Sequence, residues 1–129
     1  MKIKTVELNF DKHNAEIDLT DITRPTEHSV VESKMNDGIV VVQVLSKNVS
    51  VSTTEFEPGM RSDIKAAMGK IYMNGHAPCA DPRAALVGSS ITVPFKDNRL
   101  MLGKWQQIVL IDFNAGMERR KVVVQIMGE

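Results

Sequence analysis

Strand-forming runs are the feature of this sequence that most limits what it can fold into, and they are densest between Leu86 and Asp112. That stretch contains the only Trp of the chain and a turn signal, Lys96-Asp97-Asn98-Arg99, between two runs suited to a pleated sheet. Comparable runs occur along the whole chain. They predict strands at Lys2–Phe10, Ala15–Leu19, Gly38–Leu45, Ser46–Ser52, Ile91–Phe95, Leu100–Leu102, Gln106–Asp112 and Lys121–Met127.

Three of these runs indicate how the strands are placed. Lys2–Phe10 alternates polar and apolar residues, which is typical of a half-buried strand. Ala15–Leu19 follows after a short polar stretch and could pair with it as a hairpin. Gly38–Leu45 is the most apolar run and is rich in β-branched residues, so we expect a central strand covered on both faces.

Two helices are expected between the strands. In the first, Thr23 could cap the start, Pro25 suits the first turn, and Thr26–Met35 forms the body. The second is predicted over Glu55–Gly69, and Tyr72–Pro82 is expected to be a loop because it holds Gly, Asn and two Pro residues. The predicted fold class is therefore α+β, a mostly antiparallel sheet or sandwich with two or three short helices.

Composition limits the classes of function. With 129 residues, of which 43% are hydrophobic, the chain is expected to form one domain over residues 1–129. Sixteen basic and sixteen acidic residues cancel, so overall charge gives no reason to expect a nucleic-acid or membrane partner. The single Cys79 excludes an internal disulfide, and the first ten residues lack the apolar core of a signal peptide. We expect a soluble, cytoplasmic protein.

Several motifs of the chain resemble the YjbQ family. In the last third these are Gly88-Ser89-Ser90, Pro94, Asp97-Asn98-Arg99-Leu100, Leu102-Gly103-Lys104-Trp105-Gln106, Asp112, Arg120 and Gly128-Glu129; in the middle they are Ser46–Ser50, Glu55, Pro58-Gly59 and Asp63-Ile64. Members of the family are described as secondary thiamine-phosphate synthases. The resemblance implies an α+β fold, a homotrimer, and a site near subunit boundaries built from histidines, the Trp-Gln corner and the late Arg.

The departures from the family pattern fall on that site. The family's first histidine is Ser46 here, and the two Thr after it are Lys47 and Asn48. Of the later histidine pair, His76 matches and the second aligns with Asp81. A zinc site of three imidazoles is therefore not expected, whereas His76 and Asp81, with Asp63 as a further ligand, could hold Mg²⁺. The alternative is that His76 is an exposed loop residue.

The cations at these positions suggest a different chemistry. Lys104 stands where the family has Thr, so Lys47, Lys104 and Arg120 could together bind a phosphate, pyrophosphate or carboxylate. Ser46, Asn48, Trp105 and Gln106 would line the same anion site. The alternative is that the lysines are solvated or paired with carboxylates. Trp105 could equally anchor a core or an interface.

The candidate acidic residues can also be interpreted in two ways. Glu55 and Asp63, with His76 and Asp81, are the candidate catalytic residues, but Glu55 and Asp63 also suit the positive end of a helix. Asp112 could pair with Arg120 across the last two strands.

Three functions are compatible with this pattern. The first is a YjbQ-like protein that resembles a thiamine-phosphate synthase but has an altered, anion-binding site, with Lys47, Lys104 and Arg120 stabilising a departing pyrophosphate if it is a transferase. The second is a non-catalytic homotrimeric binding or assembly protein. The third is a metal-dependent hydrolase that uses His76 and Asp81.

Overall fold

The computed structural model describes residues 1–13, 17–71 and 81–129 of the chain. Eight strands lie in these ranges: β1 (Lys2–Phe10), β2 (Asp18–Asp21), β3 (Gly38–Val44), β4 (Val49–Thr54), β5 (Ser90–Lys96), β6 (Arg99–Leu100), β7 (Gln107–Asp112) and β8 (Arg120–Gly128). Three helices accompany them in the same ranges: α1 (Thr23–Ser33), α2 (Pro58–Gly69) and α3 (Pro82–Val87). The predicted α+β class, with mostly antiparallel strands and short helices, is confirmed.

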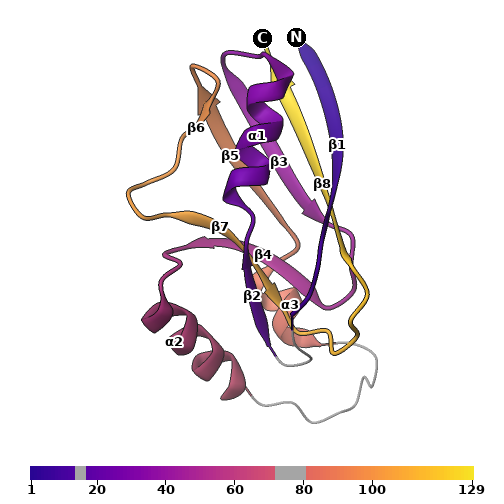
Figure 1. The fold of residues 1–129 in the computed structure, drawn as a ribbon, viewed down its shortest axis with the longest axis vertical. Helices are drawn as coiled ribbons and strands as arrows, with labels where there is room; N and C mark the ends of the chain where they lie inside the picture. The colour runs from indigo at the N-terminus through magenta and orange to yellow at the C-terminus, as the bar shows by residue number, and fades with distance from the viewer. Residues whose placement is uncertain (14–16, 72–80) are drawn as a thin grey trace.

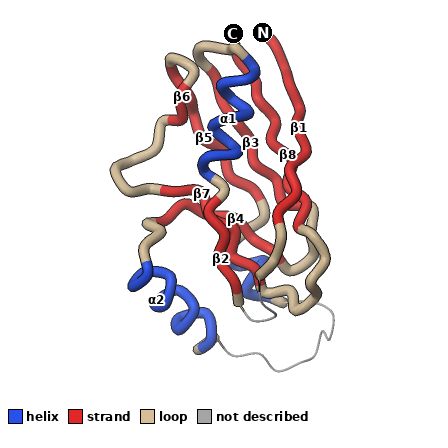
Figure 2. Tube along the Cα trace, in the orientation of Figure 1, coloured by secondary structure: helices blue, strands red, loops and turns tan. Residues whose placement is uncertain are grey.

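The strands form two antiparallel sheets (Figures 1 and 2). The larger has the order β1-β8-β3-β5-β6, and the smaller has the order β2-β7-β4. The main core lies where α1 and one face of the smaller sheet cover one face of the larger sheet. It contains buried residues of α1, β3, β4, β5, β7 and β8.

A second apolar cluster lies on the opposite face of the smaller sheet. There Leu19, Val109 and Ile111 are buried, with Ile64 of α2 and Val87 of α3 packed against them. The molecule therefore has layers, in the order larger sheet, smaller sheet, and the pair α2 and α3. Because β7 is the middle strand of the smaller sheet, it is covered on both faces, and Ile108 through Asp112 are all buried.

Strand β3 lies in the middle of the larger sheet, as predicted, but it is covered on one face only. Val40, Val42 and Val44 face the core, whereas Ile39 on the other face is 40% exposed. The prediction that Gly38–Leu45 is buried on both faces is wrong for this chain alone. The strand with that environment is β7, whose run Ile108–Ile111 is equally apolar.

The predicted hairpin between the first two strands does not form. Strand β1 pairs instead with β8 along its whole length, from Lys2 opposite Gly128 to Phe10 opposite Arg120. Strand β2 pairs with β7 in the other sheet. Sequence proximity favours a hairpin, but β1 gains nine cross-strand pairs from β8. The four residues of β2 instead pair with one edge of β7.

Helix α1 starts earlier than predicted, and Thr23 is not its cap. Thr23 lies inside the helix, where its amide and hydroxyl both donate to Asp21 Oδ1, at 2.9 and 2.6 Å. Its hydroxyl oxygen also accepts from the Ile108 amide at 2.8 Å. Thr23 therefore joins the start of α1 to β7.

The end of α1 is closed by the turn between β5 and β6. Asp97 and Asn98 in that turn have φ angles of 52° and 63°, the conformation that a tight hairpin requires. The Asn98 side-chain amide donates to the carbonyl oxygens of Val30 at 2.9 Å and Met35 at 2.6 Å. It thereby joins the last turn of α1, and Met35 beyond its end, to the turn between β5 and β6.

The other two helices begin with side-chain caps. Glu57 accepts from the amides of Gly59 and Met60 at the start of α2, and Pro58 occupies its first turn as predicted. Asp81 caps α3, which Pro82 begins. The predicted loop Tyr72–Pro82 therefore ends at a third helix, and residues 72–80 lie outside the described ranges. No helix in the described ranges is long and apolar enough to cross a membrane.

Two glycines face each other where β3 pairs with the end of β8, Gly38 opposite Gly128. A Cβ atom on Gly38 would overlap the carbonyl oxygen of Met127, and one on Gly128 would overlap that of Asp37. The next residue, Glu129, accepts backbone bonds from Asn36 at 2.6 Å and Asp37 at 3.2 Å. The Gly-Glu end of the sequence motif thus has a packing role.

We predict that Gly38→Ala lowers the free energy of unfolding by about 3 kcal/mol, because the backbone atoms that the new methyl group meets cannot move independently. Gly69→Ala is the matched control, since a Cβ there meets nothing within 4 Å. Because alanine favours a helix, this control should unfold at the same denaturant concentration or slightly higher. Chemical denaturation of both variants tests the prediction, and equal midpoints would contradict it.

Candidate functional site

Three charged side chains are buried together below the end of β7. The side chains of Lys12, Asp112 and Arg120 are only 1%, 5% and 2% exposed. Lys12 Nζ lies 3.0 Å from Asp112 Oδ1, and Arg120 Nε lies 2.5 Å from Asp112 Oδ2. The predicted Asp112–Arg120 pair is confirmed, and Lys12 is a third member that the sequence did not suggest.

The remaining donors of Arg120 hold the segment between β7 and β8. They bond to the carbonyl oxygens of Glu118 at 2.7 Å, Asn114 at 2.9 Å and Gly116 at 2.6 Å. Since these bonds and Asp112 occupy the buried guanidinium group, Arg120 does not face a ligand as the anion-site prediction required. Its role in this structure is to fix a loop.

Asn114 connects the segment between β7 and β8 to the bend before β4. Its side-chain amide donates to the Lys47 carbonyl oxygen at 2.8 Å. Next to it, just before β4 pairs with β7, the Phe113 backbone amide donates to the Asn48 carbonyl oxygen at 2.9 Å. On the other side of the bend, the Ser46 hydroxyl oxygen accepts from the Lys121 amide at 2.9 Å. The segment Ser46–Asn48 is therefore held in place by both ends of the β7–β8 connection.

Asp81 joins the same region through Asn48. The Asp81 amide donates to Asn48 Oδ1 at 2.9 Å, and its carboxylate binds Arg83 Nη2 at 2.7 Å and Nε at 3.0 Å. The hydrogen bond from the Arg83 side chain is the main cause that lowers the pKa of Asp81 below its usual range. A carboxylate of low pKa is a weak proton acceptor. Its geometry suits a helix cap rather than an acid or base.

Lys104, Trp105 and Gln106 lie on the loop that leads into β7. Gln106 Oε1 accepts from the Gly103 amide at 2.8 Å, and Gln106 Nε2 donates to Thr53 Oγ1 at 2.9 Å. Trp105 is 69% exposed with a φ angle of 64°, and the Lys104 ammonium lies 5.7 Å from its ring centroid. Trp105 is therefore not a core residue.

The two groups of candidate residues are separated along one strand pair. Val49, at the start of β4, lies opposite Asp112, whereas Thr54, at its end, lies opposite Gln107. A strand rises about 3.4 Å per residue, so the two ends of β4 are about 17 Å apart. Lys47 thus lies near one end, and Lys104 lies near the other. Within one chain, Lys47, Lys104 and Arg120 do not form the common anion site that the sequence suggested.

The candidate acids of the α2 region do not join either group. Glu55 precedes α2 and Asp63 lies on it, and both side chains are exposed. Glu57, between them, is the residue that caps the helix. His76 lies outside the described residues. Among those that are described, no group of three His, Cys, Asp or Glu side chains could hold a metal ion.

The family model for the UPF0047 protein YjbQ-like group matches residues 6–129. The chain belongs to the YjbQ family. A UPF0047 protein of Methanocaldococcus jannaschii is 31% identical, over 92% of this chain and 91% of its own. YugU of Bacillus subtilis is 24% identical, over 98% of this chain and 99% of its own.

Solved structures agree with this fold. A YbjQ-like protein of unknown function from Sulfolobus solfataricus superposes with a TM-score of 0.89 at 23% identity, covering 99% of both chains. A structural genomics target from Clostridium acetobutylicum gives a TM-score of 0.85 at 30% identity, covering 96% of this chain and 99% of its own. The similarity therefore extends over essentially the whole fold.

The structure explains several positions of the YjbQ motif by packing. Asp112 and Arg120 form the buried ion cluster, Gly128 allows the close approach to β3, and Gln106 closes a loop. Sequence reasoning missed Lys12 and Asn114, because their partners lie 100 and 67 residues away along the chain. It also missed Arg83, although its partner Asp81 is only two residues away and the spacing could have suggested the pair. A further omission was Lys121, which no motif of the sequence singled out and which the structure brings to Ser46.

We predict that Asp112→Asn lowers the free energy of unfolding by about 3–5 kcal/mol, because it leaves two buried cations without a counter-charge. Glu118→Gln is the control, since that carboxylate is 68% exposed and lies 3.7 Å from the same guanidinium group. Its cost should stay below about 1 kcal/mol. Denaturant unfolding measures both, and a similar small loss in the two variants would contradict the role of the cluster.

Proposed function

We propose that this YjbQ-family protein binds a small phosphorylated or otherwise anionic molecule at the bend Ser46–Asn48. The proposal rests on two exposed lysines beside Ser46 that have no ion-pair partner in the described residues. Lys47 follows it in the chain, and Lys121 donates its backbone amide to the Ser46 hydroxyl. Both lysines are exposed, and neither takes part in an ion pair in the described part of the structure.

Ser46 itself can contribute a donor. Its oxygen already accepts from Lys121, so its own proton is left for another acceptor. Two ammonium groups and one hydroxyl group suit a phosphate oxygen cluster, for which charge-assisted hydrogen bonds are the strongest contacts. Because Asn114 and Lys121 fix the backbone on both sides of Lys47, little of the bend needs to be ordered when a ligand binds.

The carboxylates near the bend do not compete for these lysines. Asp81 is paired with Arg83, and Asp112 is paired with Lys12 and Arg120. The pairing of Asp81 with Arg83 argues against a hydrolase that uses Asp81 as a metal ligand. It favours binding over catalysis.

We predict that inorganic phosphate or pyrophosphate raises the melting temperature of the protein, and that Lys47→Ala weakens the affinity at least about tenfold, since one charge-assisted contact is worth about 1.5–3 kcal/mol. Lys104→Ala is the matched control, because this lysine lies at the opposite end of β4 and should leave the affinity unchanged. Calorimetric titration of the three proteins gives the comparison. Equal affinity in wild type and Lys47→Ala would refute the site.

A thiamine-phosphate synthase-like transfer is the second proposal. Lys47 and Ser46 could stabilise a departing pyrophosphate, which is the charge that such a transfer develops. Incubation with a pyrimidine diphosphate and a thiazole phosphate separates the two proposals, since product formation that depends on Lys47 requires the transferase. Phosphate binding without product leaves the binding protein.

We also propose that the chain forms a homotrimer through the uncovered face of its larger sheet. The pairing of the strands places Ile3, Met127, Ile39 and Pro94 in one row across β1, β8, β3 and β5. The next row contains Thr5, Gln125, Val41 and Thr92. Neither row contains a charged residue, although 25% of the chain is charged. Depletion of charge is typical of an interface core.

We predict that Ile39→Lys dissociates the assembly, because it places an ammonium group in the middle of the apolar row. Leu86→Lys is the control, since Leu86 is 75% exposed on α3 and away from this face. Light scattering should give three times the 14.3 kDa chain mass for wild type and control, and one chain mass for Ile39→Lys. A single-chain mass for wild type would exclude the trimer.

A further inference from the structure

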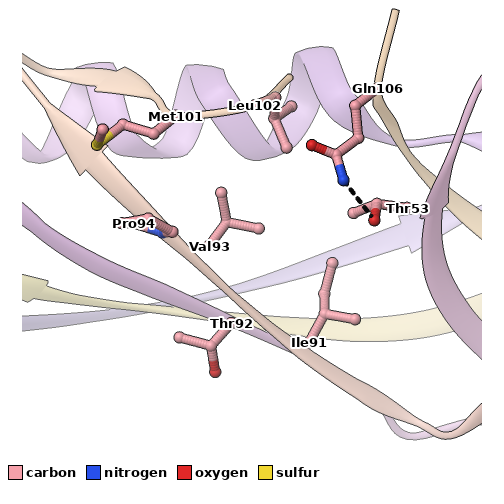
Figure 3. A pocket seen from close by; sticks show the side chains of 8 residues that line it. All are labelled: Thr53, Ile91, Thr92, Val93, Pro94, Met101, Leu102 and Gln106. Carbon is pink, nitrogen blue, oxygen red and sulfur yellow. Dashed lines mark hydrogen bonds between the residues drawn. The ribbon is translucent and has the colours of Figure 1, made fainter. Parts of the chain in front are cut away.

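A cavity of about 350 Å³ lies at the edge of β5 that the short strand β6 leaves open (Figure 3). One wall is formed by Ile91, Thr92, Val93 and Pro94 of β5, and the facing wall by Met101, Leu102 and Gln106 of the loop before β7, with Thr53 of β4 beside Gln106. Its volume is at the small end of the range of about 300–1,000 Å³ found for ligand pockets. No charged side chain lines it.

Besides Thr53 and Thr92, which carry hydroxyl groups, the lining of this cavity contains donors and acceptors of the amide type. Figure 3 shows the Gln106 side chain directed toward Thr53, with its amide between the two walls. The bonds to Gly103 and Thr53 use one lone pair and one N–H of that amide, so a second lone pair and a second N–H are left. They can pair with a group that enters the cavity.

The edge of β5 offers a second such pair. The Pro94 carbonyl group points to the loop side, where it accepts from the Met101 amide at 2.9 Å. In an antiparallel strand the backbone groups of alternate residues point to the same side, so the N–H and C=O of Thr92 also face the loop. Strand β6 pairs only with Phe95 and Lys96 and does not reach Thr92. The cavity therefore has a strand edge with one backbone donor and one backbone acceptor.

We propose that this cavity binds a small neutral ring that carries an amide or lactam edge. The ring would lie among Ile91, Val93 and Leu102, and its N–H and C=O would pair with Thr92 or Gln106. The absence of charge in the lining disfavours an anion, which distinguishes this site from the proposed one at Ser46–Asn48. Since the two sites lie near opposite ends of β4, the inference does not depend on the anion proposal.

Benzamide is a suitable probe, and its binding can be followed by NMR shifts of the backbone amides. We expect shifts at Thr92, Met101 and Gln106. N,N-Dimethylbenzamide, which lacks the N–H donors, and benzoate, which is charged, should each bind at least tenfold more weakly. Equal affinity for the three compounds, or no shift at these residues with benzamide, would overturn the proposal.

Two variants test the walls. Thr53→Val removes the hydroxyl partner of Gln106 with little change in shape and should weaken benzamide at least fivefold, whereas Thr54→Val, on the opposite face of β4, should not. Leu102→Phe is a second, independent variant, which should block the cavity by filling it with a larger side chain. Lys47→Ala should leave benzamide binding unchanged. Wild-type affinity in both Thr53→Val and Leu102→Phe would place the compound elsewhere.

Discussion

The buried cluster of Lys12, Asp112 and Arg120 is the interaction on which the arrangement of this fold depends most. It joins the segment after β1 to the ends of β7 and β8, and through carbonyl contacts it fixes the loop between those strands. Burial of charges costs free energy unless every group is paired. In the described part of the chain no buried side-chain polar atom is left without a partner, so the cost is offset here by complete pairing. The bend that carries Lys47 is positioned as a result.

The two sheets differ in what covers them. The smaller sheet is packed on both faces, whereas the larger sheet has one face that the described residues leave free to bind a partner. Strand β7 lies between the core and the helices α2 and α3, and its apolar run is used entirely for packing. The larger sheet leaves one face uncovered, and two adjacent rows of that face are uncharged, whereas Glu7 and Lys121 lie farther along it. An assembly through this face would leave the bend at Ser46 and the cavity at β5 near its margins.

Local patterns in the sequence predicted the elements well and their partners poorly. The ranges of β1, β3, β5, β7 and β8 follow from alternation and β-branched content, and the helix starts at Pro58 and the turn at Asp97 follow from local chemistry. Which strand pairs with which is decided by contacts distant in sequence, so the β1–β2 hairpin was predicted wrongly. The same limit applies to the site. The pairing of Asp112 with Arg120 was accessible because the two residues are only eight positions apart, at the end of one strand and the start of the next. Lys12 and Asn114, by contrast, act through partners far along the chain.

The position of β8 in the larger sheet has a consequence for how the chain folds. This last strand lies between β1, the first, and β3, so neither neighbour can complete its ladder until β8 is present. Pairing between the two ends of a chain requires closure of a long loop, which slows folding relative to folds with local contacts. During synthesis β1 therefore has no pairing partner in its sheet until residues 120–128 have been made. Over that interval Leu8 and Phe10, which pack against the core in the folded chain, are uncovered, and uncovered apolar surface favours aggregation.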